Sequence, residues 1–136
     1  LDAFPPDPML VREDDEIGRM LHYPPSGDAR VNYYHVREDA IGRFADAYAE
    51  RMPEVVVLLT PDELQDLELL GPGEIPPYTR ARVGDYVAIC MDASVFAWSA
   101  ASADGPDMSR LISHHSGLSP EEVRIPLIVS GTDARC

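Results

Sequence analysis

The sequence predicts a small α+β domain with a mixed sheet of about four to five strands and two to four helices. Two apolar runs with the β-branched content of strands, 31–36 and 55–59, are each followed by a helix signal. Two more strand-like runs lie within 86–98. With 136 residues, 45% of them hydrophobic, the chain has the size of one domain with a buried core.

The domain is expected to have three parts. Residues 1–30 are a proline-rich acidic entry segment, 31–100 a βαβα unit followed by a hairpin, and 101–136 a loop, a histidine pair and a last strand. The prolines at 5–8 and 24–25 exclude regular helix at both ends of the entry segment. Only Glu16–Leu21 is expected to form a helical turn or two, and the segment is predicted to wrap the domain surface.

The βαβα unit is read from periodicity. Val31–Val36 is a predicted strand in which His35 is structural or faces solvent, and Asp39 is the predicted N-cap of the next helix. One face of that helix carries apolar side chains at three- and four-residue spacing: Ile41, Phe44, Tyr48 and Met52. Val55–Leu59 is apolar at every position, which predicts a strand buried on both faces.

Local caps and turns complete this region. Thr60-Pro61-Asp62-Glu63 is a capping box, and the helix it starts is expected to run to about Leu70, before Gly71-Pro72-Gly73. Residues 86–91 and 95–98 are predicted to form a hairpin around Asp92-Ala93-Ser94.

The charge limits the partners. A formal net charge of -13 argues against nucleic acid and against an anionic membrane surface, because both are bound through basic patches. A phosphate-bearing substrate would therefore need bound metal cations. Arg80 and Arg82 are candidate contacts for a substrate phosphate or carboxylate, although they also simply offset the surrounding acidity.

Compartment signals are few. Cys90 and Cys136 have neither CxxC spacing nor a disulfide framework, which favours a reducing, cytoplasmic location. No apolar run approaches the roughly 20 residues of a membrane span, and no signal segment opens the chain.

The stretch from His114 to Gly131 carries the candidate chemistry. Ser119-Pro120-Glu121-Glu122 is a second capping box, and Ile125–Val129 is predicted to be a short strand ended by Ser130-Gly131. The candidate metal-binding groups are His114, His115, Glu121 and Glu122, with Asp104 and Asp107 nearby in sequence. Adjacent histidines seldom bind one metal ion, so His115 alone is the predicted ligand. The capping box accounts for both glutamates, and neither is given a catalytic role.

These residues resemble a known family. A histidine, two small residues, Leu-Ser-Pro-Glu-Glu, three residues and Pro-Leu-Ile, as in His115–Ile128, resemble the C-terminal signature of the alkaline phosphatase superfamily. The likeness is to its type I phosphodiesterase and nucleotide pyrophosphatase branch. Ser116 departs from the pattern, because that family usually has glycine there. A weaker resemblance at 60–64, 70–72 and 82–85 extends the likeness over roughly the second half of the chain.

The resemblance implies a fold and a site. The chain would be the cap subdomain and C-terminal segment of an alkaline-phosphatase-like α/β fold, with His115 as one ligand for zinc or manganese and Pro126–Ile128 in a core strand. A phosphate-ester or nucleotide-like small molecule would be the substrate. The family's Asp-His-Gly motif and its Ser or Thr nucleophile are absent here, so this piece is expected to be inactive alone.

A second reading stays open. The alternative is a self-contained acidic α+β module for protein interaction, with incidental histidines and no catalysis. Substrate, metal identity and oligomeric state, including a homo-oligomer, are not decided by the sequence.

Overall fold

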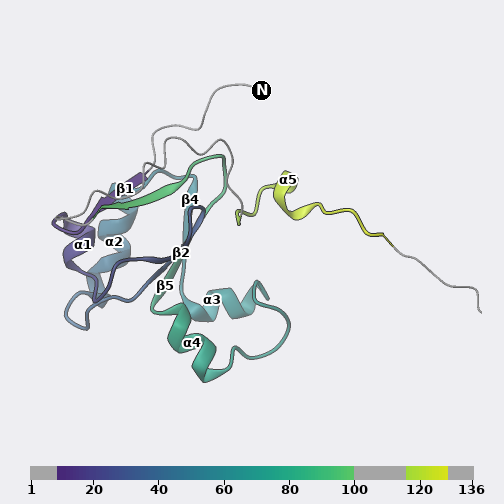
Figure 1. Ribbon diagram of the computed structural model, residues 1–136. Coiled ribbons are helices and arrows are strands. Elements are labelled where there is room, and N and C mark those ends of the chain that lie inside the picture. The colour runs from purple at the N-terminus through teal and green to yellow at the C-terminus, as the bar shows by residue number, and fades with distance from the viewer. Residues whose placement is uncertain (1–8, 100–115, 129–136) are drawn as a thin grey trace, which may run out of the picture.

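A four-stranded antiparallel sheet is the centre of the fold (Figure 1). The computed structural model describes residues 9–99 and 116–128. The strand order is β2 (Ser26–Asp28), β3 (Val31–Tyr34), β5 (Tyr86–Cys90) and β4 (Val56–Leu59). Tyr33 and Leu59 both pair with Val87, so β5 is bonded to a neighbour on each side. The predicted α+β class is confirmed.

The first face of this sheet is covered by helices α1 (Glu16–Arg19) and α2 (Ile41–Arg51). Beside them lies a two-stranded parallel sheet of β1 (Met9–Arg12) and β6 (Phe96–Ser99). The largest fully buried side chains of this core are aromatic, and Tyr34, Phe44 and Tyr48 form mutual ring contacts with centroids 5.4–5.6 Å apart. This cluster is the main core.

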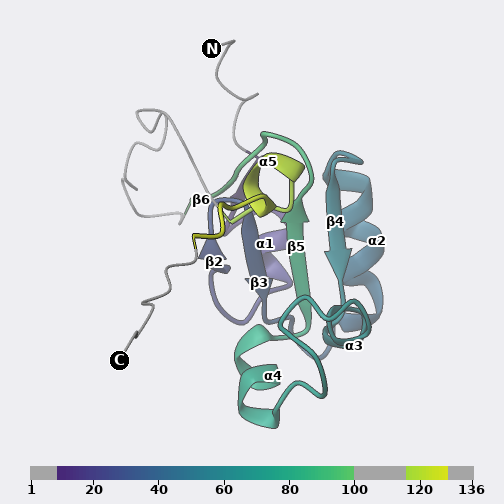
Figure 2. The same ribbon diagram turned by 90° about the vertical axis from the view of Figure 1, so that its right-hand side faces the viewer.

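The second face is only partly covered, by α3 (Pro61–Asp66) and α4 (Pro77–Val83) (Figure 2). Side chains of a strand alternate between faces. Ala88 and Cys90 of β5 therefore lie in the main core, whereas Val87 and Ile89 lie in the second cluster with Leu59, Leu64, Ile75 and Val83. Leu118, which precedes α5 (Pro120–Val123), packs against the same cluster.

The strand–helix–strand prediction for 31–59 is right in element type but incomplete in topology. β3 and β4 are both antiparallel to β5, which lies between them. β4 is consequently an edge strand, and Val57 is 37% exposed. The expectation that Val55–Leu59 is buried on both faces is wrong, because nothing described covers Val57 on the second face.

The predicted hairpin of 86–98 is also wrong. The turn exists, with the Ser94 N–H donating to Asp92 Oδ1 at 2.8 Å. Beyond it, however, the Phe96 N–H donates to the Ala29 carbonyl at 2.6 Å, and β6 pairs with β1 instead of β5. The partner of β6 is thus a segment more than eighty residues earlier, as the pairing of Met9 with Phe96 shows.

The entry segment belongs to the core and does not merely wrap the surface. Val11, Ile17, Met20 and Leu21 are each at most 8% exposed. The turn predicted in Glu16–Leu21 is confirmed as α1, whose N-cap Asp15 accepts from the Gly18 N–H at 2.8 Å. Prolines flank this segment without excluding it from the core.

Several helix boundaries differ from expectation. Ala40, not Asp39, is the N-cap of α2, and Ile41 is 41% exposed, whereas Phe44 and Tyr48 are buried as predicted. The Thr60 capping box is confirmed, but α3 ends at Asp66 instead of Leu70. α4 was not predicted, because prolines 76 and 77 indicated a linker, although proline suits a first helical turn.

The last part of the described C-terminal segment is exposed. α5 forms as its capping box predicts. The strand predicted at Ile125–Val129 is absent over 125–128, where Ile125, Leu127 and Ile128 are 82–88% exposed and lead away from the sheets (Figure 1). Val129 lies outside the described residues. Of the helices that are described, none has the length and apolarity to cross a membrane.

Candidate functional site

The segment that follows the histidine pair is attached to the domain by a buried arginine. The side chain of Arg30 is 5% exposed, and its Nε lies 2.7 Å from Glu122 Oε1 as an ion pair. Its Nη2 donates to Glu122 Oε2 at 2.8 Å, and its Nη1 donates to the Ser94 carbonyl at 3.2 Å. Residues 92 apart in the chain are thereby joined, and α5 is held against the domain.

Glu122 is the centre of this attachment. Its carboxylate also accepts from the backbone N–H groups of Gly117 and Ser119, each at 3.1 Å. Burial raises the pKa of Glu122, but the hydrogen bonds from Ser119, Arg30 and Gly117 outweigh it, so the pKa lies below its ordinary value. A Cβ at Gly117 would meet the charged ends of Arg30 and Glu122, so a larger residue there would have to displace this ion pair.

Ser116 is the first described residue after the histidines. Its φ of 79° lies in the left-handed region that favours glycine, and its hydroxyl donates to Asp28 Oδ2 at 2.9 Å. Asp28 ends β2, at one edge of the central sheet. The Ser116 side chain is therefore bonded to the edge of the central sheet, at the end of β2.

A groove runs over this second face, and we call it the sheet-face groove. It consists of two adjoining cavities of about 400 and 430 Å³ that share Gly27, Tyr33 and Leu70. The strand residues Val31, Val87 and Ile89 form the floor of the first cavity. Its other lining residues include Leu64, Leu69, Ser116 and Leu118. Gly27 has φ +115°, and a Cβ there would meet the Val31 carbonyl, so only glycine leaves this backbone unstrained.

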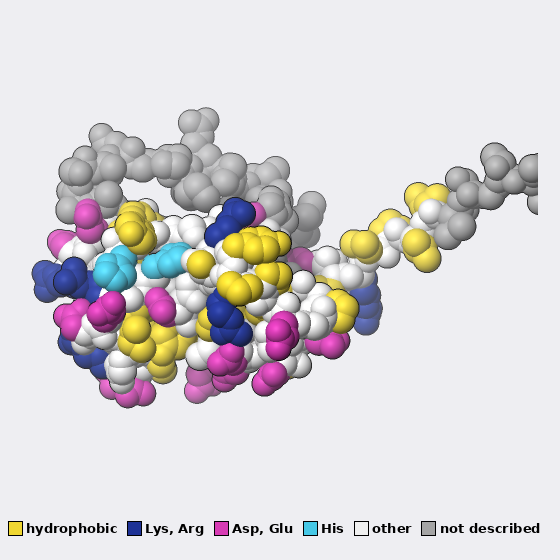
Figure 3. Space-filling view, turned by 90° about the horizontal axis from the view of Figure 1, so that it is seen from below, with side chains coloured by type: hydrophobic (Ala, Val, Ile, Leu, Met, Phe, Trp, Pro, Cys, Tyr) yellow, Lys and Arg dark blue, Asp and Glu magenta, His cyan; other side chains and the backbone are white. Residues whose placement is uncertain are grey.

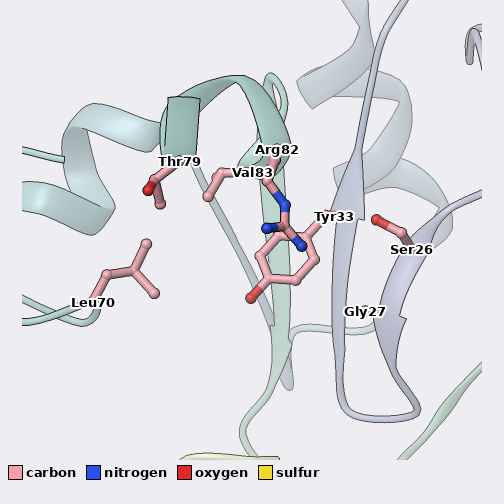
Figure 4. A pocket seen from close by; sticks show the side chains of 7 residues that line it. All are labelled: Ser26, Gly27, Tyr33, Leu70, Thr79, Arg82 and Val83. Atoms are coloured by element: carbon pink, nitrogen blue, oxygen red, sulfur yellow. The ribbon is translucent and has the colours of Figure 1, made fainter. Parts of the chain in front are cut away.

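The second cavity has a polar end formed mainly by α4. Figure 4 shows Arg82 with its guanidinium beside Tyr33, Ser26 beyond Tyr33, and Thr79 and Leu70 on the opposite side. The other candidate arginine, Arg80, is engaged, because its Nη2 lies 2.7 Å from Asp62 Oδ1. The two arginines, both candidate anion contacts by sequence, therefore differ in the structure: Arg80 is paired with Asp62, whereas Arg82 lines the second cavity.

A third cavity, of about 640 Å³, contains His35, Thr60, Arg80 and Asp85. Asp85 is committed to structure, since its Oδ2 accepts from the Val36 N–H at 2.7 Å. His35 is half-buried, and its ring meets Tyr23 edge-on at a centroid distance of 6.1 Å. The prediction that His35 is structural agrees with this contact.

The predicted metal ligand cannot be placed. His114, His115, Asp104 and Asp107 lie outside the described residues. Within 9–99 and 116–128, no three His, Cys, Asp or Glu side chains come together as a metal-binding group. Cys90 is buried and free, and burial raises its pKa to about 12, which leaves the thiol protonated and unreactive at neutral pH.

The sequence missed two parts of this site. The Arg30–Glu122 pair has no local signal, because both residues are individually unremarkable and only the fold joins them. The groove depends on the register that places Ser26 opposite Tyr33 and Tyr33 opposite Val87 on one face. By sequence alone, residues 26–28 belong only to the end of the proline-rich entry segment.

Comparison with known proteins gives no relative. No protein-family model, no curated protein and no solved structure matches this chain.

Proposed function

We propose that this chain supplies the substrate-binding cap and one metal ligand, His115, of a metal-dependent phosphoesterase of the phosphodiesterase or nucleotide pyrophosphatase type. The supporting observation is the fixed path of Ser116–Glu122 beside the sheet-face groove. Ser116, which follows His115 directly in the sequence, lines a cavity large enough for a small substrate.

The backbone at Ser116 supports the proposal independently. The resembled family usually has glycine directly after its ligand histidine, and the φ of 79° at Ser116 is one that favours glycine. A non-glycine residue tolerates this conformation at a cost of about 1 kcal/mol or more, here offset by the hydrogen bond to Asp28.

The exposed segment 125–128 is a second support. Ile125, Leu127 and Ile128 are 82–88% exposed. A run of exposed apolar side chains of this kind is typical of a segment that is buried against another part of the protein or a partner. In the proposal, this segment is a strand of a catalytic sheet whose other strands, nucleophile and remaining metal ligands lie outside this chain.

The described residues do not hold a metal by themselves, so no catalytic step is assigned to them. Zinc or manganese bound partly by His115 would stabilise the attacking and leaving oxygens of a phosphoester. The work of the described residues would be to bind the substrate's organic part and to exclude water from the apolar floor at Val31, Val87 and Ile89.

The coding DNA upstream of Leu1 is the first test. An in-frame Asp-His-Gly codon run and an earlier Ser or Thr nucleophile are expected, and a start codon immediately before Leu1 would sink the proposal. The protein encoded by the extended frame should hydrolyse a chromogenic phosphodiester with added zinc.

His115→Ala in that extended protein is the second test. Loss of a metal ligand should reduce hydrolysis by about a hundredfold or more, because second-shell changes alone cost 10–100-fold. His22→Ala is the matched control, since His22 is an exposed histidine that lines none of the three cavities described above. Undiminished activity in His115→Ala would remove the ligand assignment.

The interaction-module alternative has one observation in its favour. Residues 9–99 contain two apolar clusters that pack without help from the C-terminal segment, apart from Leu118. A chain of this kind could fold without a catalytic partner. The upstream DNA separates the two readings, because a module needs neither the nucleophile nor the Asp-His-Gly motif.

A further inference from the structure

We propose that the Arg82 end of the sheet-face groove binds an anionic group, phosphate or carboxylate, carried on a flat apolar ring. The guanidinium of Arg82 lines the second cavity next to Tyr33 (Figure 4). A guanidinium donates up to five N–H bonds in a planar fork that matches both anions. The ligand class is therefore an aryl phosphate or an aryl carboxylate.

Among the described residues Arg82 has no acidic partner, a property that it shares with Arg12, Arg19, Arg43, Arg51 and Arg124. Arg30, Arg37 and Arg80 are each paired with a carboxylate. Within residues 9–99 and 116–128, no ion pair or side-chain hydrogen bond engages Arg82. In a chain of net charge -13, carboxylates are plentiful, so an unpaired arginine facing a cavity is a ready site for an external anion.

Hydroxyl groups supply further donors at the same end. Ser26, Tyr33 and Thr79 all line the second cavity. Among the described residues, none of these three hydroxyls forms a hydrogen bond with another side chain. An anion beside Arg82 could accept hydrogen bonds from them, which is how proteins complete the coordination of a phosphate.

The adjoining surface suits a ring. Tyr33 is half-buried and lies directly across the strands from Ser26 and Val87. Leu70 and Val83 form the apolar sides of the same cavity. Figure 3 shows the molecule from the α3–α4 end, where hydrophobic and basic side chains lie next to one another. A flat apolar group between Tyr33 and Leu70 would bury its faces while its anion reaches Arg82.

The two cavities connect this end to Ser116 through Gly27, Tyr33 and Leu70. If the proposed function holds, the reacting phosphoester lies at the Ser116 end, and Arg82 recognises a second anion on the remote half of the substrate. That assignment rests on the proposed function. Binding of an anion-bearing ring to the 136-residue chain does not depend on it.

The experiment is an NMR titration of the ¹⁵N-labelled chain with phenyl phosphate, and separately with benzoate, inorganic phosphate and phenol. We expect phenyl phosphate to move the amide signals of Tyr33, Thr79 and Val83 with a dissociation constant of about 1 mM or below. Inorganic phosphate and phenol, which each lack one half of the ligand, should bind about tenfold more weakly. A benzoate affinity above that of phenyl phosphate would identify the carboxylate as the preferred anion, and a lower one would identify the phosphate.

Arg82→Gln should weaken phenyl phosphate about tenfold or more, since a charge-assisted bond is lost. Arg43→Gln is the matched control, because Arg43 is also an exposed helical arginine, lies on α2 across the sheet, and changes the net charge equally. Tyr33→Phe, which keeps the ring and removes the hydroxyl, should weaken binding less than Arg82→Gln. If Arg82→Gln does not fold, Tyr33→Phe still tests whether the ligand binds in this cavity.

Three results would overturn the proposal: equal weakening by Arg82→Gln and Arg43→Gln, signal changes confined to residues outside the groove, or no binding up to about 20 mM. Because the titration needs no turnover, its failure is distinct from failure of the phosphoesterase assay. Binding here without hydrolysis in the extended protein would retain the site and reject the enzyme.

Discussion

Arg30 is the residue on which the attachment of the C-terminal segment depends. Its side chain is 5% exposed, whereas that of Glu122 is 21% exposed. If Glu122 lost its charge, the buried guanidinium would keep its desolvation cost without compensation. If Arg30 were removed, the more exposed carboxylate could return to water. The two halves of the pair are therefore not equivalent.

Glu122→Gln is predicted to release α5 from the domain. The neutral amide retains the size of the side chain but loses the ion pair with Arg30, at a cost of about 1–3 kcal/mol given the partial exposure. The N–H of Val123, bonded to the Ser119 carbonyl at 3.1 Å, should then exchange with deuterium about ten- to a hundredfold faster. Hydrogen-exchange mass spectrometry or NMR measures this directly.

The neighbouring residue provides the control. Glu121→Gln makes the same chemical change in the same helical turn, but Glu121 is exposed. The exchange rate of the Val123 N–H in this variant should therefore be within about twofold of the wild-type rate.

The attachment of α5 should also depend on pH. Because the pKa of Glu122 is lowered in the folded state, the attachment is fully present above about pH 4.3 and is lost as pH falls through the folded pKa. If the difference in amide exchange rate between wild type and Glu122→Gln increased below pH 4, this assignment would be contradicted.

Elements whose signals are local were predictable. The capping boxes at Thr60 and Ser119 and the apolar face with Phe44 and Tyr48 depend on residues within one or two turns, so sequence spacing contains the needed information. The pairing of β6 with β1 and the exposure of 125–128 depend on distant partners, and no local pattern encodes them.

The candidate site divides in the same way. The helix start at Ser119–Glu122 was predictable, and Arg82 was predictable as a candidate anion contact, from residue type and spacing. The groove that joins them was not, because it is created by strand register and by the position of α3 and α4 over one end of the sheet. Cavities are properties of packing, not of sequence periodicity.

At the scale of the helix, Thr60→Ala is predicted to destabilise the domain by about 1 kcal/mol, within a range of roughly 0.5–2. Thr60 accepts from the Glu63 N–H at 3.3 Å, and the Glu63 carboxylate accepts from the Thr60 N–H at 2.7 Å. Urea unfolding checks the free energy. Thr60→Ser should retain most of the stability, since serine keeps the capping oxygen, and equal losses for both variants would show that the methyl group, not the cap, matters.

The molecule as a whole has one complete core and one incomplete face. The first face of the central sheet is closed by α1, α2 and the β1–β6 pair, whereas the second is closed only where α3 and α4 cross it. This asymmetry accounts for the position of the groove, and it leaves the apolar segment 125–128 without a described surface to cover.

The last prediction concerns that segment. The triple variant Ile125→Ser, Leu127→Ser, Ile128→Ser should leave the unfolding free energy of the 136-residue chain unchanged within about 0.5 kcal/mol, because these side chains are 82–88% exposed. Ile17→Ser, at a position 1% exposed, should cost several kcal/mol, roughly 2–5, and serves as the buried counterpart.

In the extended protein the expectation reverses. If 125–128 is a strand of the catalytic sheet, burying each of these side chains contributes about 1.5–3 kcal/mol, and the triple variant should abolish folding or hydrolysis there. Destabilisation of the 136-residue chain itself would show that the segment packs on this domain in solution. An extended protein that tolerates all three serines would leave the apolar residues free for another partner and would count against the catalytic-sheet assignment.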